Sequence, residues 1–239
     1  KPDRRQRQMC IRDSHEALST DYFLRDKRIR ELAIINGLSQ IYYKNSYDPN
    51  SILSILREIQ NTSDYKEHKK LSANLISTLT HLNRGTTAPN FVLTNQFDEN
   101  IKLNEHKGKY IYISFFSSES STSILHMDVI KSLYEKYSDN ITFISISLDK
   151  DKDNYINFCN EFKEYKWNIC HYDFDHNIVR DYQLKNIPSY ILLDKEGNID
   201  QAPAYTPIAD GNSVSIEKTF FTIKKNNSSK KEFKIGGKN

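Results

Sequence analysis

The first third of the chain carries apolar residues at helical spacing. Residues 21–83 hold three such series, and a polar break at residues 45–48 separates the first from the second. Asp48 followed by Pro49 is typical of a helix N-cap with proline in the first turn. Gly85 stands where a glycine would close the third helix. The pattern predicts an all-α unit of three amphipathic helices. Their apolar stripes are Tyr22, Ile29, Leu32, Ile35 and Leu38, then Ile52, Leu53, Leu56 and Ile59, then Tyr65, His68, Leu71, Leu75, Ile76, Leu79 and Leu82.

After Gly85 the spacing of the apolar residues changes. Residues 110–116 and 141–148 are near-continuous apolar runs, so we expect two central strands that are buried on both faces. A helical pattern lies between them, and such a crossover makes the two strands parallel. Shorter helices are predicted at 152–163, 177–184 and 212–223, and shorter strands at 167–172, 189–193 and 198–202. The turn signal at residues 194–197 predicts an antiparallel hairpin. The whole pattern predicts an α/β fold with a central mixed sheet and helices on both faces.

Composition narrows the class of protein. The 239 residues include 12% aromatic side chains but only 7 glycines and 6 prolines, which excludes a disordered or collagen-like chain. No run reaches the roughly 18 to 20 consecutive apolar residues that a membrane helix needs. Residues 224–239 are polar and rich in lysine, and we expect them to form a flexible tail.

The N-terminal residues do not resemble a folding segment. Residues 4–14 have no apolar period, and they match the in-frame translation of a transposase adapter used for sequencing libraries. We therefore expect residues 1–14 to lie outside the fold, and the natural N-terminus, with any signal sequence, to be missing. This segment holds five of the 34 basic residues, two of the 31 acidic residues and one of the three cysteines. The rest of the chain is formally neutral, which argues against a nucleic-acid partner, and its tail lysines are more typical of a solubilising end.

Several motifs follow the helical unit in order. They are Gly85-Thr-Thr-Ala-Pro-Asn-Phe-Val-Leu93, Lys107-Gly108-Lys109, Phe115-Phe116, Ile187-Pro188-Ser189 and Leu193-Asp-Lys-Glu-Gly197. Together they resemble the thioredoxin-like proteins of the TlpA, ResA and redoxin group. The resemblance implies a thioredoxin-like three-layer fold over residues 85–223, preceded by a helical domain at residues 15–84. It also implies thiol-disulfide chemistry without a bound cofactor, in the bacterial cell envelope or periplasm, where a lipid anchor on the missing N-terminus remains open.

The chain departs from this group at the expected active site. The group carries a Cys-x-x-Cys pair after the central strand, and Ser120 and Ser123 stand at those two positions. The chemistry needs a thiolate at a helix N-terminus and a second thiol one turn later. A serine hydroxyl can form no disulfide, so we expect the usual dithiol exchange to be absent.

Three interpretations of these serines are open. They can cap the helix that starts near Ile124, which is the commonest role of serine there. The free N–H groups of the helix end can instead bind an anion or a substrate carboxylate. The third interpretation is a serine hydrolase that uses Ser120 with Glu119 and His126, although no nucleophile elbow is present.

The resemblance implies that Pro188 has a cis peptide bond and faces the helix that starts near Ser120. The backbone of the preceding residue would then be free to pair with an extended peptide. We expect a peptide-binding surface formed by Phe116, Glu119, Ser120, Ile187 and Pro188. The alternative is that Pro188 only starts an edge strand.

The remaining candidate groups are two cysteines and a histidine-aspartate segment. Cys159 and Cys170 are expected to be buried free thiols, with a disulfide between them or a relocated redox pair as alternatives. His171, Asp173 and Asp175 alternate along an extended segment and could converge on a metal ion, but no fourth ligand is evident, and we predict no metal site.

The sequence therefore supports two main hypotheses of function. The first is a catalytically silent thioredoxin-like protein that binds a peptide or protein partner. The second is an oxidoreductase or peroxidase that works through Cys159, Cys170 or a thiol of a partner. A third possibility is that the helical unit carries the function and the α/β domain only supports it.

Overall fold

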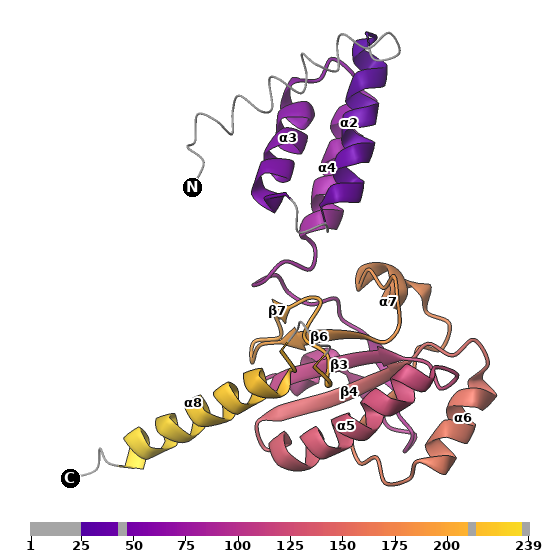
Figure 1. The fold of residues 1–239 in the computed structure, drawn as a ribbon, viewed down its shortest axis with the longest axis vertical. Coiled ribbons are helices and arrows are strands. Elements are labelled where there is room, and N and C mark those ends of the chain that lie inside the picture. Colours follow the sequence, from indigo (N-terminus) through magenta and orange to yellow (C-terminus); the bar gives the residue numbers. More distant parts are fainter. Residues whose placement is uncertain (1–24, 43–46, 210–213, 236–239) are drawn as a thin grey trace. The chain divides into compact units, whose positions relative to one another are not determined.

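The computed structural model describes residues 25–42, 47–209 and 214–235, and the chain divides into two compact units between His81 and Leu82. The first unit contains the helices α2 (Lys27–Ile41), α3 (Pro49–Thr62) and α4 (Lys66–Thr80) (Figure 1). As predicted, Asp48 caps α3 and Pro49 occupies its first turn. The predicted stripe of α3 is fully buried in the core of the unit. The adapter-like residues 1–14 and Tyr22 lie outside the described residues.

Three predictions for this unit are wrong, and one of them is the burial of Leu71 in α4, which is 44% exposed. Ile29 and Leu32 of α2 are exposed, because the helix turns a different face inward, with Glu31 buried beside Ile35 and Leu38. The burial of Glu31 follows from hydrogen bonds to two other parts of the unit, which periodicity does not reveal. Gly85 has a φ of 87°, but α4 already ends at Thr80, so the glycine does not close that helix.

The second unit is built on a five-stranded sheet with the order β5-β4-β3-β6-β7. Its strands are β3 (Tyr110–Phe116), β4 (Ile141–Ser147), β5 (Asn168–His171), β6 (Ser189–Leu193) and β7 (Ile199–Gln201). The strands β3, β4 and β5 are parallel, whereas β6 and β7 run antiparallel to their neighbours. The fold class predicted from the sequence, a mixed sheet between helices, is confirmed.

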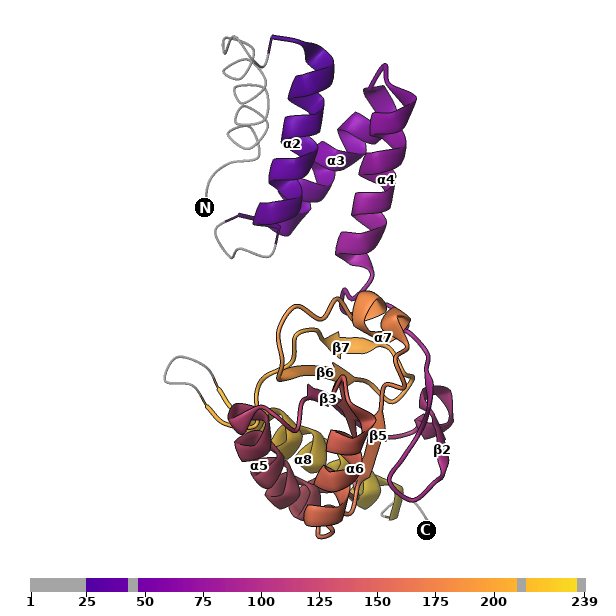
Figure 2. The same cartoon turned by 90° about the vertical axis from the view of Figure 1, so that its right-hand side faces the viewer.

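Helices and a small hairpin cover the two faces of this sheet. The elements are β1 (Val92–Thr94), β2 (Asn100–Lys102), the 3₁₀-helix η2 (Leu103–His106), α5 (Ser121–Tyr137), α6 (Lys152–Glu161), α7 (His176–Asp181) and α8 (Glu217–Ile235). Apolar side chains of α5, α6 and α8 form one core with Tyr112 and Phe143 of the sheet. The opposite core joins α7, β1, β2 and η2 to Ile113 and Ile146 (Figure 2). The central strands are buried on both faces, as their continuous apolar runs predict.

The last helix is longer than the sequence predicts. The helix α8 continues to Ile235, so residues 224–235 are helical, where we expected a flexible tail. Polar contacts hold its middle part to the rest of the domain: Asn227 accepts from Lys195 at 2.7 Å and donates to Asn140 at 2.9 Å. Lys224 donates to the carbonyl of Lys136 at 3.1 Å. Polar contacts of this kind produce no periodic pattern of apolar residues, so the sequence pattern did not predict the second half of α8.

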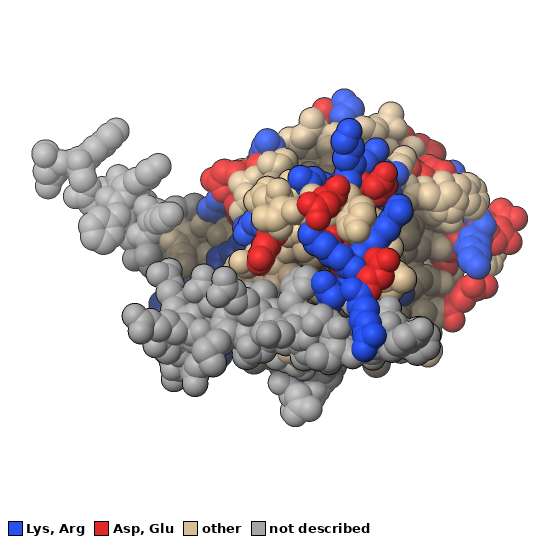
Figure 3. All heavy atoms as spheres, turned by 90° about the horizontal axis from the view of Figure 1, so that it is seen from above, with Lys and Arg blue, Asp and Glu red and all other residues tan. Residues whose placement is uncertain are grey.

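None of the described helices combines the length and the hydrophobicity of a membrane span. On the face shown in Figure 3, basic and acidic side chains lie next to one another and do not separate into large fields of one sign.

Candidate functional site

The helix α5 begins directly behind the central strand β3. Ser120 is its N-cap, and the Ser120 hydroxyl accepts the backbone N–H of Ser123 with 3.3 Å between Oγ and N. Ser123 is buried, and its own hydroxyl accepts the backbone N–H of Ser117 at 3.4 Å. Both serines are thus engaged in ordering the start of the helix, as the capping interpretation predicts.

A buried carboxylate holds the loop that leads to Ser120. Asp149 follows β4, is only 2% exposed, and accepts the hydroxyl of Ser117 at 2.6 Å and the backbone N–H of Ser118 at 2.9 Å. Its second oxygen accepts the hydroxyl of Ser147 at 2.7 Å. Asp149 is not among the predicted site residues, because its partners in the loop, Ser117 and Ser118, lie 32 and 31 positions away in the sequence. The signal that could have found it is an aspartate directly after a buried strand, beside a serine-rich loop.

The peptide bond between Ile187 and Pro188 is cis, as the resemblance implies. The next residue, Ser189, lies opposite Phe115 in the pairing of β3 with β6. This register places Pro188 beside the end of β3, from which the loop to Ser120 starts. The strand β6 pairs with both β3 and β7, so the alternative that Pro188 starts an edge strand is wrong.

The residues predicted to form a binding surface separate into two groups. Phe116 is 1% exposed and packs against Phe158 with 5.1 Å between ring centroids, so it belongs to the core and is not accessible to a partner. In contrast, Ile187 is 41% exposed, and the exposed Glu119 accepts the side-chain amide of Asn154 at 3.0 Å. Apolar character alone misled the prediction for Phe116, because the last residue of a central strand still faces the core.

The arrangement does not support the serine-hydrolase interpretation. Its three residues have different partners: Ser120 caps α5, Glu119 contacts Asn154, and Nδ1 of His126 lies 2.6 Å from the hydroxyl of Tyr190. Partial burial lowers the pKa of His126 below its usual value of 6.5. The imidazole is therefore engaged with an aromatic side chain of β6 and not with the serine.

Cys159 and Cys170 are both free thiols. Cys159 packs against the core on the α5 and α6 side of the sheet, whereas Cys170 belongs to the core on the other side. The sheet thus separates the two sulfur atoms. Burial raises the pKa of Cys159 to about 11 and that of Cys170 to about 12, so both groups are protonated thiols at neutral pH.

The histidine-aspartate segment is held by its own hydrogen bonds. Nε2 of the buried His171 lies 2.9 Å from the carbonyl of Asp149, and Nδ1 lies 3.2 Å from Asp173. Asp175 instead caps α7 by accepting the backbone N–H of Asn177 at 3.0 Å. The three predicted side chains do not converge, and no group of His, Cys, Asp or Glu in the described segments has the arrangement of a metal site.

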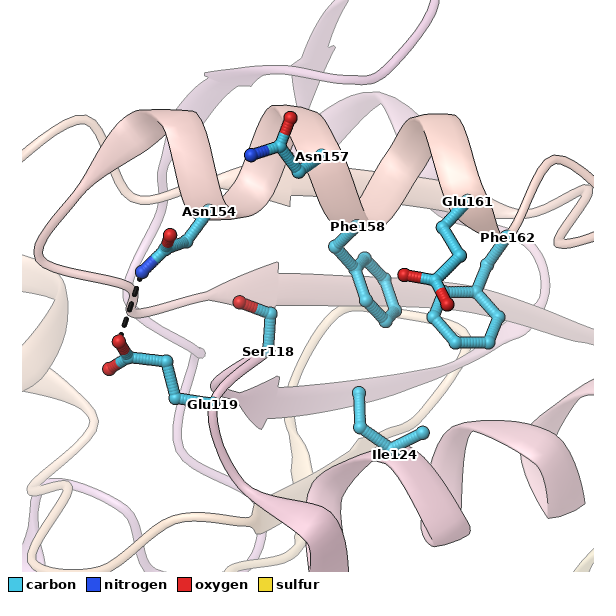
Figure 4. A pocket seen from close by; sticks show the side chains of 8 residues that line it. All are labelled: Ser118, Glu119, Ile124, Asn154, Asn157, Phe158, Glu161 and Phe162. Atoms are coloured by element: carbon cyan, nitrogen blue, oxygen red, sulfur yellow. Dashed lines mark hydrogen bonds between the residues drawn. The ribbon is translucent and has the colours of Figure 1, made fainter.

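A groove of about 420 Å³ opens beside the loop that leads to Ser120 (Figure 4). It lies between the start of α5 and one side of α6, and the sequence analysis did not predict it. Its lining residues are Ser118, Glu119, Ile124, Asn154, Asn157, Phe158, Glu161 and Phe162.

Comparisons with known proteins identify relatives of the α/β unit. Residues 108–199 match a family model described as thioredoxin-like. The thiol-disulfide oxidoreductase ResA of Bacillus thuringiensis subsp. konkukian is 27% identical over 118 residues, which are 49% of this chain and 67% of that protein. ResA of Bacillus anthracis is 28% identical over 116 residues, or 48% of this chain and 66% of that protein. The chain thus spans about two thirds of the length of these relatives.

Solved structures show the same fold. A proposed thiol-disulfide oxidoreductase from Bacteroides vulgatus aligns with a TM-score of 0.54 and 24% identity, covering 60% of this chain and 99% of that chain. A solution structure of a proposed thiol-disulfide oxidoreductase from the same species aligns with a TM-score of 0.51 and 26% identity, covering 62% of this chain and 93% of that chain.

Proposed function

We propose that the domain whose residues 108–199 match the thioredoxin-like family model binds an extended peptide segment of a protein partner without exchanging disulfides. The proposed binding surface, which we call the ledge, comprises Glu119, Ser120, Ile187 and Pro188. The proposed location is the bacterial cell envelope or periplasm, and it rests on the family resemblance.

The observation that supports the proposal most is that Ile187 has an exposed side chain and, in the described part of the chain, backbone groups without hydrogen bonds. Its side chain is 41% exposed, and within the described residues its backbone N–H and C=O groups make no hydrogen bond. The cis bond to Pro188 follows directly, next to the end of β3. An extended peptide can pair with such free backbone groups as an added strand does, and it can cover the apolar side chain.

The absence of disulfide exchange is proposed on chemical grounds. In the correspondence that the resemblance implies, Ser120 and Ser123 stand where the family chemistry needs sulfur, and the hydroxyl of Ser120 accepts its capping bond. Of the two thiols in the described chain, Cys170 is buried as expected and Cys159 is only half-buried; both have raised pKa values, and they lie on opposite sides of the sheet. A nucleophilic cysteine needs the opposite conditions, a lowered pKa and an accessible sulfur.

Peptide display tests the ledge directly. Random octapeptides are selected on the wild-type protein and then measured on the variants Ile187→Asp and Ile156→Asp. Ile156 is a matched control, because it is also an exposed isoleucine, at 44%, but lies on α6 outside the ledge and the groove. We expect the selected peptides to lose about tenfold or more in affinity on Ile187→Asp, since a charge then replaces the apolar contact, and to bind Ile156→Asp normally.

Two outcomes would contradict the proposal. If the selected peptides bind all three proteins equally, the ledge is not the binding surface. If the wild-type protein reduces insulin at the rate of an active thioredoxin, and the rate depends on Cys159 or Cys170, the oxidoreductase hypothesis is correct instead.

A further inference from the structure

The groove beside Ser118 has one wall from α6 and one from the start of α5. The residues of α6 and its C-cap that line the groove form pairs three or four positions apart, which places them on one face of the helix. These are Asn154, Asn157, Phe158, Glu161 and the C-cap residue Phe162. The other wall consists of Ser118, Glu119 and Ile124. Glu119 belongs to both the groove and the ledge, so the two surfaces meet at this residue.

Apolar side chains form the middle of this groove. Ile124, Phe158 and Phe162 line it, and Figure 4 shows Glu119 on the far side of Ser118 from these three side chains, with Glu161 over the ring of Phe162. Phe158 is almost fully buried, while Ile124 and Phe162 are half-buried and offer apolar surface to a ligand. A ligand that covers this surface must have an apolar part.

Two carboxylates flank the apolar surface. Glu119 contacts the uncharged amide of Asn154, and Glu161 is exposed. Neither carboxylate forms an ion pair with any basic side chain among the residues that the structure describes. The groove therefore combines an apolar floor with negative charge that is not compensated locally, and it favours a cation with an apolar stem.

We infer that the groove binds a lysine or arginine side chain of the peptide that lies on the ledge. The methylene stem would cover Ile124 and the phenyl rings, and the cationic head would reach a carboxylate at either end. Arginine fits best, because its planar guanidinium group stacks on aromatic rings and pairs with carboxylates through two N–H groups. This inference rests on the proposed function, because the same peptide must occupy both the ledge and the groove.

The test compares two peptides that differ only in charge. An eight-residue peptide of alternating valine and serine with one central arginine is titrated into the full chain, and so is its counterpart with citrulline, which keeps the shape of arginine without the charge. We expect the citrulline peptide to bind about tenfold more weakly at low salt, and the difference to shrink at high salt. The backbone amide signals of residues 154–162 should shift only with the arginine peptide.

Variants of the two carboxylates test whether the preference for arginine arises in the groove. Glu161→Gln and Glu119→Gln should each reduce the preference for arginine, and Gln at position 119 can still accept the hydrogen bond from Asn154. Glu135→Gln is the matched control, because Glu135 is an exposed carboxylate of α5 outside the groove. We expect this control to keep the full preference.

The outcomes separate the two proposals. If both peptides bind equally and Ile187→Asp abolishes binding, the ledge is supported and the inference about the groove is overturned. If arginine is preferred and Ile187→Asp has no effect, the groove binds the basic side chain but the ledge is not used. If neither peptide binds, and display yields no binder, both proposals fail.

Discussion

The hydroxyl of Ser120 accepts a hydrogen bond from the backbone N–H of Ser123, with 3.3 Å between Oγ and N. The two residues are therefore joined across the first turn of α5, and the cap orders one of the N–H groups that a helix start leaves unpaired. In a redox-active thioredoxin-like protein, the same pair of positions would hold the nucleophilic and the resolving thiol. If Ser120 and Ser123 correspond to that pair, as we propose, the chain keeps the helix start but lacks the sulfur atoms for disulfide chemistry.

Restoring the sulfur atoms should restore the chemistry. In a background of Cys159→Ala and Cys170→Ala, the double variant Ser120→Cys and Ser123→Cys should form a disulfide and gain insulin reductase activity. The helix end lowers the pKa of the introduced thiol at position 120, which should therefore be alkylated about tenfold faster at pH 7 than a free cysteine.

Single variants provide the control for this gain of function. Ser120→Cys alone should trap mixed disulfides without turnover, because no second thiol resolves them. If the double variant forms the disulfide but remains inactive, the ledge has lost the geometry for substrates as well as the thiols.

The native thiols should react slowly and in a fixed order. At pH 7 the pKa values of about 11 for Cys159 and about 12 for Cys170 leave very little thiolate. The rate of alkylation should rise about tenfold per pH unit between pH 7 and 10, because the thiolate fraction does so while pH stays below the pKa. Cys159 should react before Cys170, which is fully buried.

Peptide mass spectrometry after timed treatment with iodoacetamide measures both rates. The intact mass should not change on reduction, whereas an increase by the mass of two hydrogen atoms would show a disulfide. A cysteine that reacts within seconds at pH 7 would support the oxidoreductase hypothesis.

The loop before Ser120 should depend on Asp149. Its carboxylate accepts three hydrogen bonds while almost fully buried, so Asp149→Ala leaves several donors unpaired and should cost about 3 kcal/mol in the free energy of unfolding. Asp149→Asn keeps one carbonyl acceptor and should cost about 1 to 2 kcal/mol. Urea denaturation measures both. The exposed Asp139→Ala is the control, with an expected change within about 0.5 kcal/mol.

Local patterns were sufficient to predict much of the fold. The strand at residues 110–116 was predicted with its observed bounds. A continuous apolar run of this length is stable only where both of its faces are buried, as in the centre of a sheet that is covered on both sides. The hairpin was predicted from the turn signal at residues 194–197, and Gly197 there adopts a φ of 85°, which glycine tolerates best. The helix cap at Ser120 follows from the same kind of local preference.

Features that depend on distant polar contacts could not be predicted in this way. Asp149 acts on Ser117 from 32 positions away, and Asn227 of α8 contacts Asn140 across 87 positions. The groove arises only when α6 is packed beside the start of α5. Periodicity reports which side chains are apolar, but it does not report which polar groups meet after folding.

The helical unit offers the last prediction, because Glu31 is buried there with two partners. Its Oε2 lies 2.7 Å from Nδ1 of His68 and accepts the hydroxyl of Ser63 at 2.5 Å. Glu31→Gln places an amide in this buried hydrogen-bonded position at nearly constant volume and should destabilise the unit by about 3 kcal/mol, because a donor is left facing His68 or Ser63. Hydrogen exchange should then show faster exchange in α2 and α4, while the amides of β3 and β4 keep their protection.

The control Glu67→Gln changes an exposed glutamate in the first turn of α4 and should cost about 0.5 kcal/mol. Equal exchange in α2 for both variants would contradict a stabilising role for the buried pair.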